Sequence, residues 1–177
     1  YIRGGNYCQE LLEEIALTIL RKGGLPHISS TSDNFTETIY KDERIKIETL
    51  EKTPLHVLKM IENIDTYIVI EPYENPAIQN TFPREKLLAS SKASTPIKDV
   101  IYGAKEEFAP GKKWLYAGWP SEPAAAYYNI DYKLLQQFII EGMSVPIEEL
   151  KKRTDVLSDF LKSAKNVYIK DELGTDF

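Results

Sequence analysis

The stretch YIRGGNYCQELLEEIALTILRKGGLPHIS, residues 1–29, has the pattern of a strand, a helix and a second strand. Residues 1–3 are typical of a strand end, and the glycines that follow predict a turn. Asn6 is the expected cap of the helix, with Gln9 as its partner in a capping box. Gly23-Gly24 ends the helix because glycine accepts a left-handed backbone. Such a unit predicts two parallel strands. Apolar side chains on one helix face follow at helical spacing: Leu11, Leu12, Ile15, Ile19 and Leu20.

The rest of the chain continues this alternation of strands and helices. Strands are expected at residues 67–70, 113–117 and 167–169. Helices are expected at these places: residues 34–41, residues 45–50, after a Thr53 cap, residues 83–93, after Thr95-Pro96, after Ser121, after Asp131 and from Pro146. We therefore predict one α/β domain over residues 1–177, a layered sandwich with a mostly parallel sheet of about four or five strands and helices on both faces.

The composition excludes several classes of protein. The chain has 42% apolar and 28% charged residues, which is typical of a folded protein and argues against disorder. Its net charge is −5 and its basic residues are scattered, so we expect no nucleic-acid partner. No apolar stretch is long enough to span a bilayer, and we expect no membrane partner. A single cysteine, Cys8, favours a reducing compartment, and the predicted location is cytoplasmic.

Residue types that carry catalysis or bind metals are sparse. The two histidines, His27 and His56, lie in no metal-binding spacing, and a His/Cys zinc site needs several convergent ligands. Cys8 is near a predicted helix start, where a thiolate is stabilised, but no histidine accompanies it in sequence. We therefore assign no catalytic residue, no metal ligand and no cofactor-binding residue to this chain.

The turn Arg3-Gly4-Gly5-Asn6 is the one candidate for phosphate binding. A glycine turn between a strand and a helix can hold a phosphate with backbone N–H groups. A dinucleotide site needs G-x-G-x-x-G, and here no third glycine follows. A tight turn without a ligand is the simpler interpretation, and both remain open.

One edge of the predicted sheet gathers polar and aromatic side chains. In a parallel sheet all strand carboxyl ends meet at one edge, where ligands collect. Ordinary solvated loops are the alternative to a cleft or an interface. The candidates at this edge are Arg3, Tyr73, Glu74, Asn75, Trp119 and Ser121.

The segment Lys113-Trp114-Leu115-Tyr116-Ala117-Gly118-Trp119-Pro120 is followed by an alanine-rich stretch and Asp131-Tyr132. This order resembles the middle of the amino-terminal domain in the aminopeptidase T family of metallopeptidases. Three further stretches fit the same family in the same order, so that the resemblance covers most of the chain. They are Ile2-Arg3-Gly4, the Glu74-Asn75 loop with Asn80-Thr81-Phe82-Pro83, and Ala164-Lys165-Asn166-Val167 with Gly174-Thr175-Asp176.

The resemblance implies a two-domain, homodimeric enzyme that removes amino-terminal residues from peptide substrates with two divalent metal ions. In that family the metal ligands lie in a carboxy-terminal catalytic domain, beyond the Gly-Thr-Asp segment, so none is carried over to this chain. The family has Leu after that segment, and here it is Phe177. The implied role is a non-catalytic amino-terminal domain that shapes the substrate entrance and makes domain or subunit contacts. The alternatives are a stand-alone module that binds a nucleotide or other small anion at the strand carboxyl edge, and a pure interaction domain.

Overall fold

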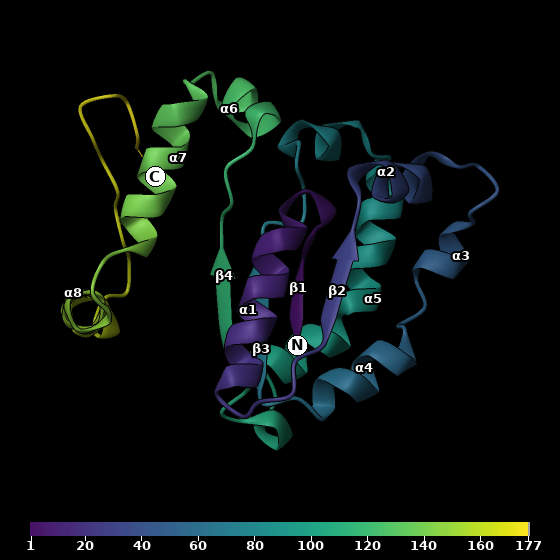
Figure 1. The fold of residues 1–177 in the computed structure, drawn as a ribbon, viewed down its shortest axis with the longest axis horizontal. Helices are drawn as coiled ribbons and strands as arrows, with labels where there is room; N and C mark the ends of the chain where they lie inside the picture. The colour runs from purple at the N-terminus through teal and green to yellow at the C-terminus, as the bar shows by residue number, and fades with distance from the viewer. Residues whose placement is uncertain (177) are drawn as a thin grey trace. The chain divides into compact units, whose positions relative to one another are not determined.

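A computed structural model describes residues 1–176, so Phe177, where the chain departs from the family pattern, lies outside the described residues. Its centre is a four-stranded sheet of β1 (Ile2–Gly5), β2 (Ile28–Thr31), β3 (Thr66–Ile70) and β4 (Lys113–Ala117). The strand order is β2-β1-β3-β4 and every pair is parallel (Figure 1). The predicted α/β layered sandwich with a parallel sheet is therefore confirmed.

The chain forms two compact units, residues Tyr1–Gln136 and the residues from Gln137 onward. The sheet belongs to the first unit. The helices and 3-10 turns, in chain order, are η1 (Asn6–Cys8), α1 (Gln9–Arg21), α2 (Asp33–Lys41), α3 (Ile47–Leu50), α4 (Leu55–Glu62), η2 (Pro76–Thr81), α5 (Arg84–Tyr102), η3 (Glu106–Phe108), α6 (Glu122–Tyr128), α7 (Tyr132–Met143) and α8 (Ile147–Lys162).

The first unit buries apolar side chains on both faces of the sheet. On one face, α1 packs Leu12 and Ala16 against Ile2 and Ile70 of the central strands. On the other face, α4 and α5 form a second cluster, of Ile61, Val100 and Ile101. Helices thus cover opposite faces of the sheet, α1 on one and α4 and α5 on the other (Figure 1).

α1 ends at the glycines, as the sequence predicts, but its start is not capped by the predicted residue. The Gly23 and Gly24 amides donate to the Leu20 and Ile19 carbonyl oxygens, at 2.9 and 3.0 Å, with Gly23 at a φ of +81°. This is the Schellman ending that glycine favours. Asn6 begins the 3-10 turn η1 instead of capping α1, and no side chain caps α1.

Two predicted helix starts are wrong. Residues 84–102 form one helix through Pro96, where a new helix was expected. The side chains of Ala89, Ala93, Val100 and Ile101 make a continuous buried face along α5, and tertiary packing of this kind outweighs a local break signal. Thr53 does not cap α4: its hydroxyl donates to the Ala93 carbonyl oxygen, at 2.9 Å.

The caps predicted for the later helices are confirmed. Ser121 accepts the Ala124 amide at the start of α6, and Asp131 accepts the Leu134 amide in the first turn of α7, each at 3.1 Å. Pro146 directly precedes α8, as expected.

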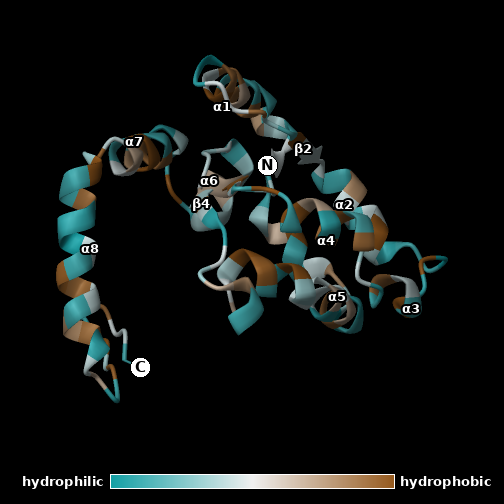
Figure 2. Ribbon diagram, turned by 90° about the horizontal axis from the view of Figure 1, so that it is seen from below, coloured by the Kyte–Doolittle hydropathy of each residue, from teal (hydrophilic) through white to brown (hydrophobic). Residues whose placement is uncertain are grey.

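The second unit contains α8, which is amphipathic but has no buried residue. Brown apolar and teal polar patches alternate along this helix (Figure 2). The strand predicted at residues 167–169 is wrong: this segment has no strand partner, and only a bridge between Lys170 and Asp176 forms nearby. High β propensity is not enough without a partner strand.

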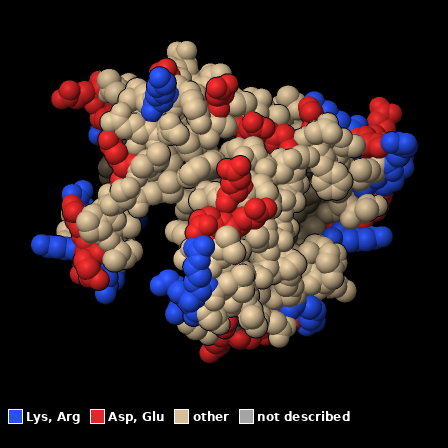
Figure 3. Space-filling view, viewed as in Figure 1, with Lys and Arg blue, Asp and Glu red and all other residues tan. Residues whose placement is uncertain are grey.

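Charged side chains of both signs occur on the surface. Acidic and basic side chains are interspersed on the face shown in Figure 3, without a continuous basic area. Within residues 1–176 no helix combines the length and the apolar character that crossing a bilayer requires.

Candidate functional site

The order in which the chain adds strands reverses between β1 and β3, and the carboxyl ends of these two strands lie at this switch point. From β1 the chain moves to β2 on one side, and it later returns to β3 on the other side. Such a switch point leaves a crevice outside the strand ends because the neighbouring connections diverge. The loops after β1, β3 and β4 therefore meet at the edge where the sequence predicts a cleft.

Asp33, at the first position of α2, holds the loop after β3. Its two carboxylate oxygens accept the backbone amides of Glu74 and Asn75, at 3.1 and 2.8 Å. The Asn75 side chain in turn accepts the Ala77 amide at 3.0 Å and caps η2. The loop is thus fixed by side-chain acceptors at positions far apart in sequence.

Ser121 joins the loops after β3 and β4. Its hydroxyl donates to the Glu74 carbonyl oxygen at 2.5 Å and accepts the Ala124 amide at 3.1 Å. The residue is buried, with 6% of its surface exposed, so both bonds are shielded from water. One hydroxyl therefore caps α6 and ties two loops of the edge together.

A hollow of about 460 Å³ opens beside this contact. This volume is within the range of small-molecule sites. Glu74 and Glu122 supply carboxylates, and both residues are exposed. A hollow with carboxylates and aromatic rings favours cationic or apolar groups over anions. The lining residues are Tyr7, Glu74, Trp119, Pro120, Ser121, Glu122, Pro123 and Tyr132.

Tyr7 links the turn after β1 to this hollow. Its hydroxyl donates to the Trp119 carbonyl oxygen at 3.3 Å. Burial, followed by the nearby acidic groups Cys8 and Glu71, raises the pKa of the Tyr7 phenol above its ordinary value of 10.0. Tyr7 is therefore a neutral hydrogen-bond donor at physiological pH.

Glu71 lies directly after β3 and organises a second polar contact. Its carboxylate accepts the Tyr73 amide at 3.4 Å and the Tyr116 hydroxyl. Partial burial, followed by the bond to Glu71, raises the pKa of the Tyr116 phenol. The carboxylate thus connects β4 to the loop after β3.

Cys8 is a packing residue in this structure. It is 3% exposed, and its thiol donates to the Gly5 carbonyl oxygen at 3.1 Å. Burial raises the pKa of the thiol, although its backbone hydrogen bonds act in the opposite direction. A nucleophilic cysteine needs a depressed pKa and access, and this site provides neither.

The predicted glycine turn is wrong, because Gly4 and Gly5 are the last residues of β1 and pair with Ser30 and Thr31 of β2. The Gly5 amide donates to the Glu71 carbonyl oxygen at 3.2 Å. A Cβ at Gly5 would lie 2.5 Å from the Tyr7 ring and 2.9 Å from the Pro72 carbonyl oxygen. Glycine is needed here for this close approach. The Gly5 amide is already paired, and the carboxylates of Glu71 and Asp33 are close to Tyr7. This segment is therefore a poor binding site for an anion.

The six residues predicted for this edge divide into three groups. Glu74, Trp119 and Ser121 line the same hollow. Tyr73 and Asn75 flank Glu74, where the Asn75 side chain caps η2. Arg3 lies inside β1, paired with Ser29 and Val69, and is separate from the hollow.

Sequence reasoning missed Tyr7, Asp33, Glu71 and Tyr116. Their partners are between 41 and 112 residues away along the chain, except for the Tyr73 amide, which is two residues from Glu71. The only local signal was their position at or just beyond strand ends. Contacts between residues so far apart in sequence depend on the order of the strands in the sheet, and the sequence pattern does not specify that order.

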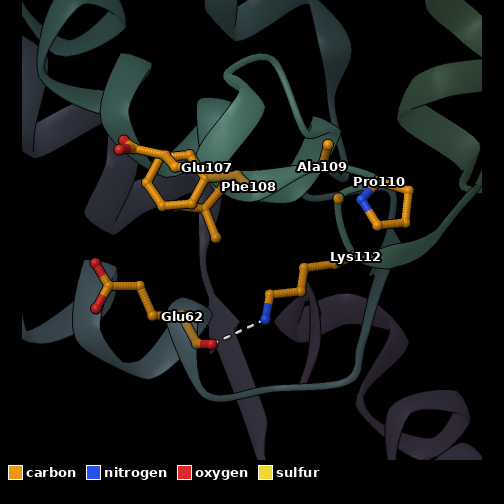
Figure 4. Close-up of a pocket in the computed structure, with 8 residues that line it drawn as sticks. Glu62, Glu107, Phe108, Ala109, Pro110 and Lys112 are labelled. Carbon is orange, nitrogen blue, oxygen red and sulfur yellow. Dashed lines mark hydrogen bonds between the residues drawn. The ribbon is translucent and has the colours of Figure 1, made fainter.

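A second hollow, of about 340 Å³, lies near the amino-terminal ends of β3 and β4. Figure 4 shows the Lys112 side chain pointing to the end of α4, where its ammonium donates to the Glu62 carbonyl oxygen at 2.8 Å. A cation at this position complements the negative end of the helix dipole. The contact serves to hold α4 against the start of β4.

Comparisons with known proteins give no match to a family model, to a curated protein or to a solved structure. Among residues 1–176, no three side chains of histidine, cysteine, aspartate or glutamate are grouped so that they could hold a metal ion.

Proposed function

We propose that this chain is the non-catalytic amino-terminal domain of a cytoplasmic metal-dependent aminopeptidase. It would shape the substrate entrance and contact the carboxy-terminal catalytic domain of the same protein. Four sequence stretches in the family order support this proposal. The confirmed parallel sheet contains two of them, Ile2-Arg3-Gly4 in β1 and the start of residues 113–120 in β4. The single cysteine, which is free and buried, supports a reducing compartment.

The position of residues 113–120 carries the proposal. This segment is one of the stretches that resemble the family, and it forms β4 and the loop that leads to the hollow. Trp114, Leu115 and Tyr116 are each about half exposed, at 55, 54 and 52%. Exposed apolar residues gathered on one element are typical of a contact surface. One segment thus combines a surface for protein contacts with the wall of a hollow.

The hollow supports a role at the entrance for peptides. A peptide presents a positively charged amino terminus and side chains that are often apolar. The carboxylates of Glu74 and Glu122 attract the charge, and the rings of Tyr7, Trp119 and Tyr132 offer apolar and cation–π contacts. We propose that the domain guides the amino-terminal end of the peptide without taking part in the chemical step.

The two divalent metal ions implied for the parent enzyme do not fit the described residues. Among these residues no three side chains of histidine, cysteine, aspartate or glutamate lie close enough together to hold a metal ion. We therefore assign no catalytic step to them.

The proposal is tested in the intact parent enzyme with Trp119→Ala. Loss of the ring should raise KM for peptides by about 10-fold, with a smaller change for an amino-acid anilide, which is too short to use an entrance. Phe138→Ala is the matched control because Phe138 is an exposed aromatic residue outside the hollow. Equal effects on both substrates would contradict the entrance role. Metal-dependent hydrolysis of the anilide by the purified 177-residue chain would contradict the non-catalytic role.

The alternative, an anion-binding module, predicts a different result. Inorganic phosphate would then shift the amide resonances of Gly4, Gly5 and Asn6 in a saturable way. Because the Gly5 amide is already paired with Glu71, we expect no such shift. A saturable shift would make the anion-binding module the better account.

A further inference from the structure

The hollow at the carboxyl edge of the sheet carries two carboxylates that have no cationic partner in the described part of the chain. Glu74 and Glu122 line it from two loops, and the Ser121 hydroxyl joins these loops by its bond to the Glu74 carbonyl oxygen, at 2.5 Å. Among residues 1–176 neither glutamate takes part in an ion pair. The residues that line the hollow include no lysine, arginine or histidine. A cationic ligand would therefore meet two carboxylates and no competing positive charge.

The remaining walls of the hollow suit an alkyl chain. They are mostly aromatic and pyrrolidine rings, from Tyr7, Trp119, Pro120, Pro123 and Tyr132. The Tyr7 hydroxyl is already engaged, because it donates to the Trp119 carbonyl oxygen at 3.3 Å. The hollow thus combines an apolar ring surface with exposed negative charge.

We propose that this hollow binds the side chain of a lysine or arginine at the amino-terminal end of a peptide. Both side chains pack an apolar stem along apolar surface and keep the charged head group in polar surroundings. The stem would lie against the rings, and the head group would reach Glu74 and Glu122. The peptide context rests on the function proposed above, but binding of the basic side chain can be measured without it.

Other classes of side chain use less of the hollow. An acidic side chain would be repelled by both carboxylates, and Asp33, which accepts the Glu74 amide at 3.1 Å, adds negative charge to the same loop. An uncharged apolar side chain would gain only the contacts with the rings. A basic side chain also gains attraction to the carboxylates and cation–π contacts.

Binding to the 177-residue chain tests this proposal, with lysinamide and norleucinamide as probes. Both probes carry the same amino-terminal charge and a four-carbon side chain, and only lysinamide has a second charge at the end of that chain. The indole N–H resonance of Trp119 reports on the hollow, and that of Trp114, which does not line it, is an internal reference. Lysinamide should bind about 3- to 10-fold more tightly. The difference should shrink as the ionic strength rises.

Isosteric substitutions separate the charge of the hollow from its shape. Glu74→Gln and Glu122→Gln each remove one carboxylate, and the Glu74 loop is held by hydrogen bonds of its backbone, so the fold should persist. Each substitution should lower the affinity for lysinamide more than the affinity for norleucinamide. Glu48→Gln is the matched control, because Glu48 is an exposed glutamate of α3 outside the hollow, and it should leave both affinities unchanged.

The outcomes distinguish this proposal from the proposed function. Equal affinities for the two probes, or an affinity for lysinamide that neither Glu74→Gln nor Glu122→Gln lowers, would overturn it and leave the aminopeptidase role standing. In the intact parent enzyme, KM should be lower for peptides that begin with lysine than for those that begin with norleucine, and Glu74→Gln should remove most of this difference. Carboxylate-dependent binding of lysinamide by a protein without peptidase activity would support the basic site and contradict the aminopeptidase role.

Discussion

The Ser121 hydroxyl donates to the Glu74 carbonyl oxygen at 2.5 Å, and these two residues are 47 positions apart in sequence. The bond joins the loop after β3 to the start of α6, and both residues line the same hollow. This buried hydroxyl therefore helps to set the shape of the hollow.

Replacing this hydroxyl should weaken the fold. Ser121→Ala removes a helix cap and leaves the Glu74 carbonyl without its donor, so we expect the free energy of unfolding to fall by about 1–3 kcal/mol. Urea denaturation measures this change. Ser91→Ala, at an exposed position of α5, is the control and should change stability by less than about 0.5 kcal/mol. Equal effects of the two substitutions would contradict the role of Ser121.

Gly5 is expected to tolerate no side chain. Gly5→Ala places a Cβ 2.5 Å from the Tyr7 ring and 2.9 Å from the Pro72 carbonyl oxygen. The ring can move but the backbone oxygen cannot move easily, so we expect a loss of about 1–3 kcal/mol in the free energy of unfolding.

Gly142→Ala is the matched control for this substitution. Gly142 lies in α7, and a Cβ there meets no atom within 4 Å. Alanine favours a helix over glycine, so this variant should be as stable as the wild type or more stable by up to about 1 kcal/mol. Thermal unfolding of both variants, followed by circular dichroism, distinguishes the two cases. A neutral Gly5→Ala would mean that the end of β1 is not tightly packed.

The raised pKa of Tyr7 predicts how stability changes at alkaline pH. Below pH 10 the phenol is neutral in the folded and unfolded states, so its contribution is fully present. Above that pH the unfolded chain ionises first, because burial raises the pKa of Tyr7 in the folded state. The free energy of unfolding should therefore fall as the pH rises from about 10.

Tyr7→Phe should make this alkaline fall less steep. Urea denaturation between about pH 8 and about pH 11 measures the slope. Tyr168→Phe is the control, because Tyr168 is 77% exposed, and it should leave the slope unchanged. An identical slope in the wild type and in Tyr7→Phe would show that Tyr7 ionises as freely as an exposed tyrosine.

Cys8 should react slowly with a thiol reagent in the folded protein. Its thiol is 3% exposed and burial raises its pKa, so little accessible thiolate is present. The reaction should accelerate strongly in denaturant. Equal rates in the folded and unfolded chain would restore Cys8 as a candidate nucleophile.

The sequence pattern predicted the four strands of the sheet well. It predicted helix breaks and the last strand less well, because tertiary contacts override local signals there. The strand at residues 113–117 was predicted with its observed bounds, because a β-rich run follows a Pro-Gly break. The break expected at Pro96 is absent, since buried contacts extend along the whole of α5. Residues 167–169 have the composition of a strand and lack a partner in the structure.

The candidate site shows the same limit. Glu74, Trp119 and Ser121 were predicted because they lie just beyond the ends of β3 and β4, and the structure brings them together. Arg3 also lies near a strand end, but it is separate from the hollow. Tyr7 and Asp33 enter the site through contacts across the sheet, which strand composition does not encode.

The central claim is that this chain is one domain of a metal-dependent aminopeptidase, and the coding sequence beyond Phe177 tests it most directly. Our account predicts a continuation with well-separated glutamates, a histidine and a later His-x-Asp pattern, which would supply the metal ligands of a second domain. A stop codon soon after Phe177 would contradict the account and leave a complete protein without that catalytic domain.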